Sequence, residues 1–134
     1  MIGAPNRDGF YTVTPYLMVV DPGGLVGFLE SAFAAEVTYR TTGSGGGQHI
    51  ELKIGDSRIM VGGRDPVEQD QPAALFLYVD DVDGLHDRAV QAGATSIIEP
   101  ADGEFEEQRG AGVVDPAGNQ WFLGQHGPNS TAPH

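Results

Sequence analysis

The chain contains one structural unit that occurs twice, at an offset of sixty residues. Residues 15–21 read Pro-Tyr-Leu-Met-Val-Val-Asp, and residues 75–81 read Leu-Phe-Leu-Tyr-Val-Asp-Asp. Three positions of this alignment are identical, and a Gly-Leu pair follows both segments at the same distance. A repeat of this length predicts that one supersecondary unit is built twice along the chain.

Each copy is predicted to fold as a βαβββ module, in which a strand is followed by a helix and three further strands. In the first copy Asp21 can cap a helix that begins at Pro22, and Leu25 opens an apolar stripe of helical period. In the second copy we expect Asp83 to be the cap and Gly93 to end the helix. The later strands are predicted over 36–41, 48–54 and 58–61 in the first copy, and over 95–99, 111–115 and 119–124 in the second.

A length of 134 residues suits one domain, and the pattern of elements predicts the α+β class. Curved mixed sheets would then surround a concave pocket. The predicted domain covers 10–125, with modules over 10–63 and 73–125, a connector over 64–72, and flexible termini over 1–9 and 126–134.

Composition excludes several classes of function. With only 7 Lys and Arg and a net charge of −12, the chain is a poor partner for nucleic acid. It has no cysteine, which rules out disulfides, thiol catalysis and cysteine-bound zinc. No apolar run approaches the roughly 20 residues of a membrane helix, and no leader is evident. We therefore expect a cytoplasmic domain with no membrane partner, whose acidity serves solubility or a cationic ligand.

The predicted strands have one apolar side and one mixed side. Along 48–54 the apolar residues alternate with others, so that His49 and Glu51 point the same way. A two-residue turn at 55–56 would pair Glu51 with Met60, and directly paired residues share a face. A helix should cover the apolar side, whereas the mixed side suits the wall of a pocket. Aromatic residues at mixed-side positions are Tyr16, Phe76, Tyr78 and Phe122.

His49 and Glu51 are the candidate catalytic residues, because an i, i+2 pair on one strand could act as an acid–base or proton-relay pair. The alternative is a structural pair that bonds internally, or to Lys53 and Arg58 across the sheet. Both side chains are expected to face water in the free protein. The mixed-side aromatic residues likewise form either a cage for a planar guest or ordinary core.

Phrases along nearly the whole chain resemble the vicinal-oxygen-chelate (VOC) superfamily, within its glyoxalase/bleomycin-resistance/dioxygenase group. They are Thr-Pro-Tyr-Leu at 14–17, Phe-Ala-Ala-Glu at 33–36, His-Ile-Glu-Leu-Lys-Ile-Gly-Asp at 49–56, Leu-Tyr-Val-Asp-Asp-Val at 77–82 and Asp-Pro-Ala-Gly-Asn at 115–119. Several match its divergent demethylubiquinone-methyltransferase-like branch. The resemblance implies the fold firmly, but not the activity, because enzymes and antibiotic-sequestering proteins share it.

In metalloenzymes of that superfamily each module gives two metal ligands, which the resemblance places here at Thr14, Met60, Ala74 and Phe122. Such side chains offer a divalent ion almost no donors, so we expect no metal and no cofactor. The space would be open to an apolar guest. The predicted ligand-binding residues are Thr14, Tyr16, His49, Glu51, Met60, Ala74, Phe76, Tyr78, Gln120 and Phe122.

Three functions remain open at this point. The leading one is a small-molecule-binding protein that sequesters an aromatic metabolite or antibiotic. The acidity of the chain is compatible with a ligand that is also basic. The second is a metal-independent isomerase, lyase or cyclase in which His49 and Glu51 transfer protons. The third is a metal-dependent enzyme of the superfamily with displaced ligands.

Remaining features have simpler interpretations. His86 is expected on the surface of the second helix, and His126 and His134 in the polar tail. The acidic stretch 99–107 is predicted to be a loop, either solvated or a lid for a basic ligand. Curved sheets leave exposed edges, and related proteins pair modules within or across chains, so a homodimer is expected.

Overall fold

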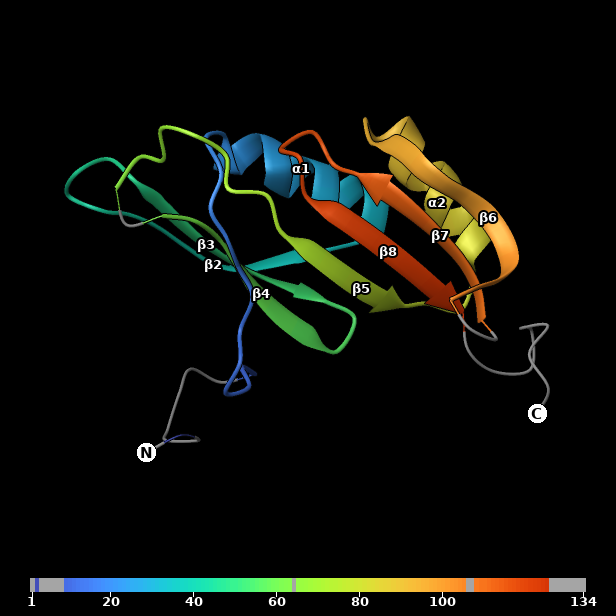
Figure 1. Cartoon of the computed structure of the whole chain (residues 1–134). Coiled ribbons are helices and arrows are strands. Elements are labelled where there is room, and N and C mark those ends of the chain that lie inside the picture. Colours follow the sequence, from blue (N-terminus) through green and yellow to red (C-terminus); the bar gives the residue numbers. More distant parts are fainter. Residues whose placement is uncertain (1, 3–8, 64, 106–107, 126–134) are drawn as a thin grey trace.

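Two four-stranded sheets, each backed by one helix, make up the computed structural model (Figure 1), which describes residues 2, 9–63, 65–105 and 108–125. The first module consists of β1 (Tyr16–Leu17), α1 (Pro22–Phe33), β2 (Glu36–Thr42), β3 (Gln48–Ile54) and β4 (Ser57–Gly62). The second consists of β5 (Ala74–Tyr78), α2 (Val82–Gln91), β6 (Thr95–Phe105), β7 (Gln108–Val114) and β8 (Gln120–Gln125). The predicted α+β fold with two βαβββ modules is confirmed.

The two sheets have the same topology. Their strand orders are β1-β4-β3-β2 and β5-β8-β7-β6, and the first strand of each module runs parallel to the last. The predicted turn at 55–56 is also confirmed, because Glu51 pairs with Met60 and Ile54 with Ser57. The shared order places β1 and β5 at sheet edges.

The helices begin in the same way in both modules. Asp21 and Asp81 are the N-caps, and each carboxylate accepts a hydrogen bond of 3.0 Å from a backbone amide three residues later. The prediction that Asp83 caps the second helix was therefore wrong, because Asp81 is the sixty-residue partner of Asp21. Gly93 follows α2 with a φ of 118°, as its predicted role at the helix end requires.

The core lies between each sheet and its helix and continues from one module to the other. Trp121 on β8 is fully buried, and its ring lies 5.1 Å from that of Phe33 on α1. Leu17, Ile50 and Leu52 fill the first module beneath α1. The faces of the sheets turned away from the helices, here called the open faces, therefore carry the alternate residues.

A buried carboxylate holds the turn between β7 and β8. Asp115 is 3% exposed and accepts hydrogen bonds from the backbone of Ala117 and Asn119, the Asn119 amide and the Trp121 indole. The Asn119 side chain in turn accepts from the backbone of Ala73, just before β5. This turn therefore fixes the start of the second module as well as its end.

Two strand predictions need correction, and one prediction lies outside the described part. The acidic stretch from 99 is not a loop, because β6 continues to Phe105 with three register shifts against β7 that let the hairpin bend. The alternation of residues 14–19 predicts a first strand of that length, but only Tyr16 and Leu17 pair with β4. The predicted flexibility of 1–9 and 126–134 falls, except at Ile2 and Gly9, outside the described residues.

Candidate functional site

The open face of the first sheet carries a chain of three hydrogen-bonded side chains. On β3, His49 Nε2 lies 2.8 Å from Glu51 Oε2. The other ring nitrogen of His49, Nδ1, lies 3.1 Å from the hydroxyl of Tyr16 on β1. The sequence therefore placed His49 and Glu51 on one face correctly, and the strand order adds Tyr16 to them.

The triad runs from solvent into the protein. Tyr16 is 41% exposed, whereas Glu51 is only 1% exposed. The expectation that Glu51 faces water was wrong, because Tyr39 on the neighbouring strand lies directly beside it in the β2–β3 register and aromatic rings surround His49. Partial burial, together with the Glu51 charge, raises the pKa of the Tyr16 phenol above its ordinary value.

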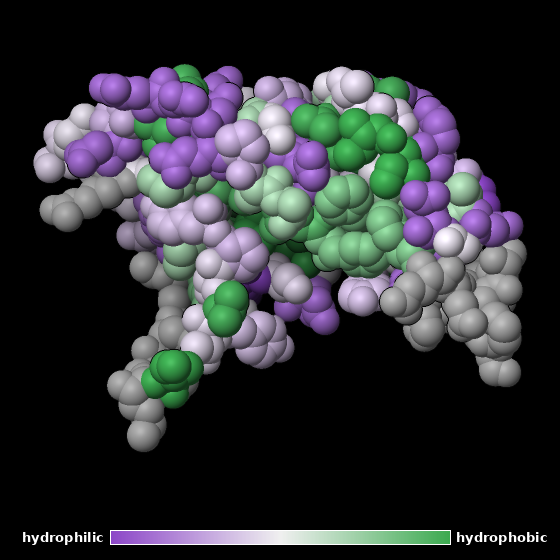
Figure 2. Space-filling view, in the orientation of Figure 1, coloured by the Kyte–Doolittle hydropathy of each residue, from purple (hydrophilic) through white to green (hydrophobic). Residues whose placement is uncertain are grey.

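The open face of the second sheet is aromatic instead. Phe105 on β6 contacts both Phe76 on β5 and Phe122 on β8, with ring centroids 5.0 and 5.9 Å apart. Tyr78 lies against Phe76 at 5.1 Å and is 75% exposed. Hydrophobic surface gathers over this sheet in Figure 2. Phe105 was missed by the sequence reasoning because it lies in the stretch predicted to be an acidic loop.

Glycines make room for these rings. In the β7–β8 register Gly110 faces Gly124, and Gly112 faces Phe122. A Cβ atom at Gly124 would lie 2.6 Å from the Phe76 ring, and one at Gly110 would collide with the Phe105 ring. The aromatic rings therefore pack directly against the backbone of these glycines, where any larger residue would place its Cβ atom against a ring.

The positions at which the resemblance places metal ligands do not fit a metal. The Thr14 hydroxyl already donates to the Tyr11 carbonyl at 3.1 Å. Met60 offers a thioether, Ala74 a methyl group and Phe122 a ring, none of which balances the charge of a divalent ion. Among the residues that the structure describes, no three His, Cys, Asp or Glu side chains converge as a metal-binding group.

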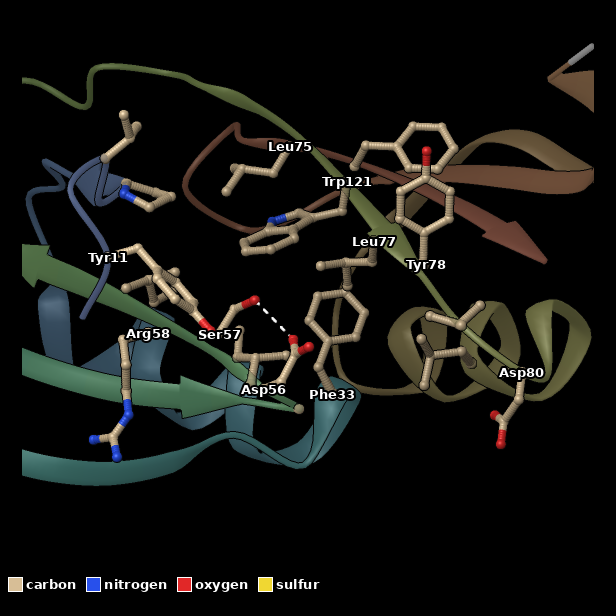
Figure 3. A pocket seen from close by; sticks show the side chains of 18 residues that line it. Tyr11, Phe33, Asp56, Ser57, Arg58, Leu75, Leu77, Tyr78, Asp80 and Trp121 are labelled. Atoms are coloured by element: carbon tan, nitrogen blue, oxygen red, sulfur yellow. Dashed lines mark hydrogen bonds between the residues drawn. The ribbon is translucent and has the colours of Figure 1, made fainter. Parts of the chain in front are cut away.

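A cleft of about 730 Å³ lies between the modules (Figure 3). Leu75, Leu77 and Trp121 line it from the second module. The β3–β4 turn and Tyr11 line it from the first, and Phe33 lies near the end of α1. Two predicted ligand-binding residues, Phe76 and Tyr78, also contribute to its wall. The sequence did not predict this cleft, because it lies at the junction of two helix-facing surfaces.

The other predicted site residues are more dispersed. Ala74 and Gln120 pair with each other at the start of β5 and β8, and both are exposed. His86 is buried to 7% exposure, which corrects the prediction of a surface residue, and its Nε2 lies 2.7 Å from the Ser96 hydroxyl. His126 and His134 lie outside the described residues.

Arg109 fastens the β6–β7 hairpin to α2. Its guanidinium bonds both carboxylate oxygens of Asp83 at 2.7 and 2.8 Å, and Asp102 at 2.9 Å. Hydrogen bonding from Arg109 lowers the pKa of the Asp83 carboxyl. The acidic stretch is therefore tied down within the module at Asp102.

Comparison with known proteins identifies the family. The sequence matches the Glyoxalase/Bleomycin resistance protein/Dioxygenase superfamily over residues 11–123, and the chain therefore belongs to it. An uncharacterised protein of Mycobacterium bovis is 31% identical over 125 residues, covering 84% of this chain and 82% of its own length. No helix among the described residues is long and apolar enough to cross a membrane.

Solved structures show the same fold. TioX from Micromonospora is 24% identical, with a TM-score of 0.70, and the match covers 85% of this chain and 97% of that one. Glyoxalase I from Zea mays is 16% identical, with a TM-score of 0.72, over 84% of this chain and 43% of the maize chain. Members of the superfamily bind small molecules and often form dimers.

Proposed function

We propose that the protein binds a planar aromatic metabolite or antibiotic, without a metal, on the open faces of its two sheets. One observation carries this proposal: the four expected ligand positions hold side chains that offer a metal almost no donors, while aromatic rings line the open faces. Flat aromatic walls favour planar guests through stacking, at about 0.5–1.5 kcal/mol for each ring pair. The net charge of −12 favours a basic guest.

The family supports binding without prescribing a reaction. Its description includes bleomycin resistance, and sequestration of a compound needs affinity but no chemistry. Within the superfamily, the phrases at 49–56 and 77–82 support placement in the demethylubiquinone-methyltransferase-like branch. A chain without cysteine is suited to the cytoplasm, which is the location we propose.

A fluorescent planar cation, 9-aminoacridine, tests the proposal by equilibrium titration. We expect saturable binding that weakens when His49 or Glu51 is changed to alanine. His49 lies on the open face and can bond the ligand at about 0.5–3 kcal/mol, and the buried Glu51 carboxylate holds its ring in place. Glu30→Ala is the matched control, since this exposed carboxylate lies on α1 and does not line the cleft. If both site variants unfold easily and still bind normally, the pair is structural and the binding site lies elsewhere.

A second candidate function is a metal-independent isomerase, lyase or cyclase. The 2.8 Å hydrogen bond between His49 and Glu51 favours it, because a carboxylate so placed can stabilise a protonated imidazole. Recovery of a bound compound chemically unchanged after long incubation supports sequestration, whereas conversion supports an enzyme. A metal-dependent enzyme with displaced ligands would need a donor group that the described residues do not form.

We also propose that the protein is a homodimer. Both β1 and β5 lie at sheet edges, where strands are usually paired or covered. Apolar and aromatic side chains beside these edges are exposed, including Val13 at 85% and Tyr78 at 75%. Light scattering at micromolar concentration should give twice the mass of the 14.1 kDa chain, and a single species of monomer mass would contradict the proposal.

A further inference from the structure

When Glu51 is ionised, the hydrogen bonds of the triad on the first sheet run in one direction. An ionised carboxylate can only accept, so His49 Nε2 donates to Glu51 across 2.8 Å. A neutral imidazole then has its lone pair at Nδ1, which accepts from the Tyr16 hydroxyl across 3.1 Å. Tyr16 thus donates its hydroxyl hydrogen to His49, and the lone pairs of its oxygen remain available to a ligand.

The architecture of the module does not require this triad. In the second module the positions equivalent to Tyr16, His49 and Glu51 are Phe76, Gly110 and Gly112, as the matching registers of the two sheets show. The same βαβββ unit therefore forms around a phenyl ring and two glycines. Burying the Glu51 carboxylate to 1% exposure costs free energy unless its charge is compensated. Here its hydrogen-bond partner, His49, connects it to the exposed Tyr16 phenol.

We propose that Tyr16, His49 and Glu51 form a proton relay whose outer end, the Tyr16 phenol, exchanges a proton with the bound ligand. The inference rests on the proposed binding of a planar ligand to this face, and it assigns Tyr16 as the catalytic residue. His49 receives the proton, and Glu51 is a positioning residue that acts through His49. The ligand class is a planar carbon acid, a molecule with a weakly acidic C–H bond beside an electron-withdrawing group.

The proton step balances without any other reactant. The ligand C–H bond breaks and its proton goes to Tyr16 Oη, while the phenol proton moves to His49 Nδ1. The electron pair of the C–H bond stays on the ligand, which becomes an anion. The resulting imidazolium pairs with the Glu51 carboxylate, so the buried charge is compensated. Return of the proton by the same path restores the triad.

A first experiment tests the coupling in the protein alone. The Glu51 charge contributes to the raised pKa of Tyr16, so Glu51→Gln should lower the Tyr16 pKa toward its ordinary value of 10.0. Site-resolved ¹³C NMR of the tyrosine Cζ atoms during an alkaline titration measures this pKa. A Tyr16 titration that is identical in both proteins would overturn the relay.

A second experiment measures proton transfer to the relay. The probe is 5-nitrobenzisoxazole, a planar carbon acid whose deprotonation breaks its ring N–O bond and releases a coloured phenolate. Tyr16→Phe keeps the ring but removes the hydroxyl, and should lower kcat about tenfold or more with KM little changed. Glu51→Gln should also lower kcat, because an amide stabilises imidazolium poorly. Glu30→Gln, which makes the same change at an exposed carboxylate on α1, is the matched control and should retain wild-type kcat.

The values of kcat and KM separate failure of the relay from failure of the proposed function. Saturable turnover with equal kcat in wild type, Tyr16→Phe and Glu51→Gln contradicts the relay and leaves ligand binding intact. A wild-type protein that neither binds nor converts the probe contradicts both. Loss of kcat in Tyr16→Phe with unchanged KM supports both.

Discussion

The two modules share their topology but use their open faces in opposite ways. The first places Tyr16, His49 and Glu51 in one hydrogen-bonded chain, and the second places three phenylalanine rings over glycine backbone. The buried helix-facing sides differ less, because both consist of alternating apolar residues beneath a helix. The repeated unit thus conserves its core and changes its surface, so function is to be sought on the open faces.

The modules also differ in how their turns are held. In the first, Gly55 and Asp56 form an exposed two-residue hairpin turn. In the second, Asp115 accepts from backbone and side-chain donors that lie inside the protein. Local hairpin geometry is sufficient in the first module. A buried polar network holds the turn of the second module, and through Asn119 it also holds Ala73 just before β5.

The largest effect should come from breaking that network. Asp115→Ala leaves several buried donors unpaired and should destabilise the protein by about 3–5 kcal/mol in urea denaturation. Asp56→Ala, in the corresponding turn of the first module, should change the free energy of unfolding by no more than about 0.5 kcal/mol. Equal effects at both turns would show that the modules do not differ in this respect.

A smaller loss is expected from adding one methyl group to the aromatic face. In Gly124→Ala the new Cβ would lie 2.6 Å from Phe76 and 2.8 Å from Gln108 Oε1, and overpacking should cost about 1–3 kcal/mol. Gly27→Ala on α1 is the control, because its Cβ would meet no atom within 4 Å beyond its chain neighbours and the backbone of its own helix. It should stabilise the helix by about 0.5–1 kcal/mol. A neutral Gly124→Ala would mean that the Phe76 ring is not packed on this strand.

The smallest effect concerns the helix ends. Ala34 follows α1 with a φ of 55°, a left-handed conformation that disfavours alanine, whereas the residue with positive φ after α2 is Gly93. Ala34→Gly should therefore stabilise the protein by about 0.5–1 kcal/mol, and Gly93→Ala should destabilise it by a similar amount. Chemical denaturation of the two variants measures both changes, and effects of the same sign would refute this difference.

Sequence patterns predicted the features that depend on residues close together along the chain. A two-residue turn fixes the pairing that follows it, so the β3–β4 register and the shared face of His49 and Glu51 were predictable. The sixty-residue repeat also contained the correct cap, Asp81, although the helix signal alone favoured Asp83. Periodicity and turn chemistry were therefore sufficient for the fold.

What the sequence missed depends on neighbours that are distant along the chain. The burial of Glu51 follows from packing beside β2, and nothing in the local pattern of 48–54 reports that strand. The contribution of Phe105 requires β6 to continue through an acidic, proline-containing stretch that favours a loop. The Tyr16 contact to His49 likewise needs the parallel β1–β4 pairing. That pairing joins segments that are distant along the chain, and no local sequence pattern reports it.

Metal analysis tests the central claim, that the site is a metal-free binding face with a polar triad at one end. Protein purified without chelators should contain well under one equivalent of Zn, Ni, Fe, Mn or Co per chain, and EDTA should not change its thermal stability. Thr14, Met60, Ala74 and Phe122 cannot compensate a buried divalent charge, so an ion would remain in water. A tightly held equivalent of metal, lost on chelation together with stability and bound through His49 and Glu51, would contradict the account.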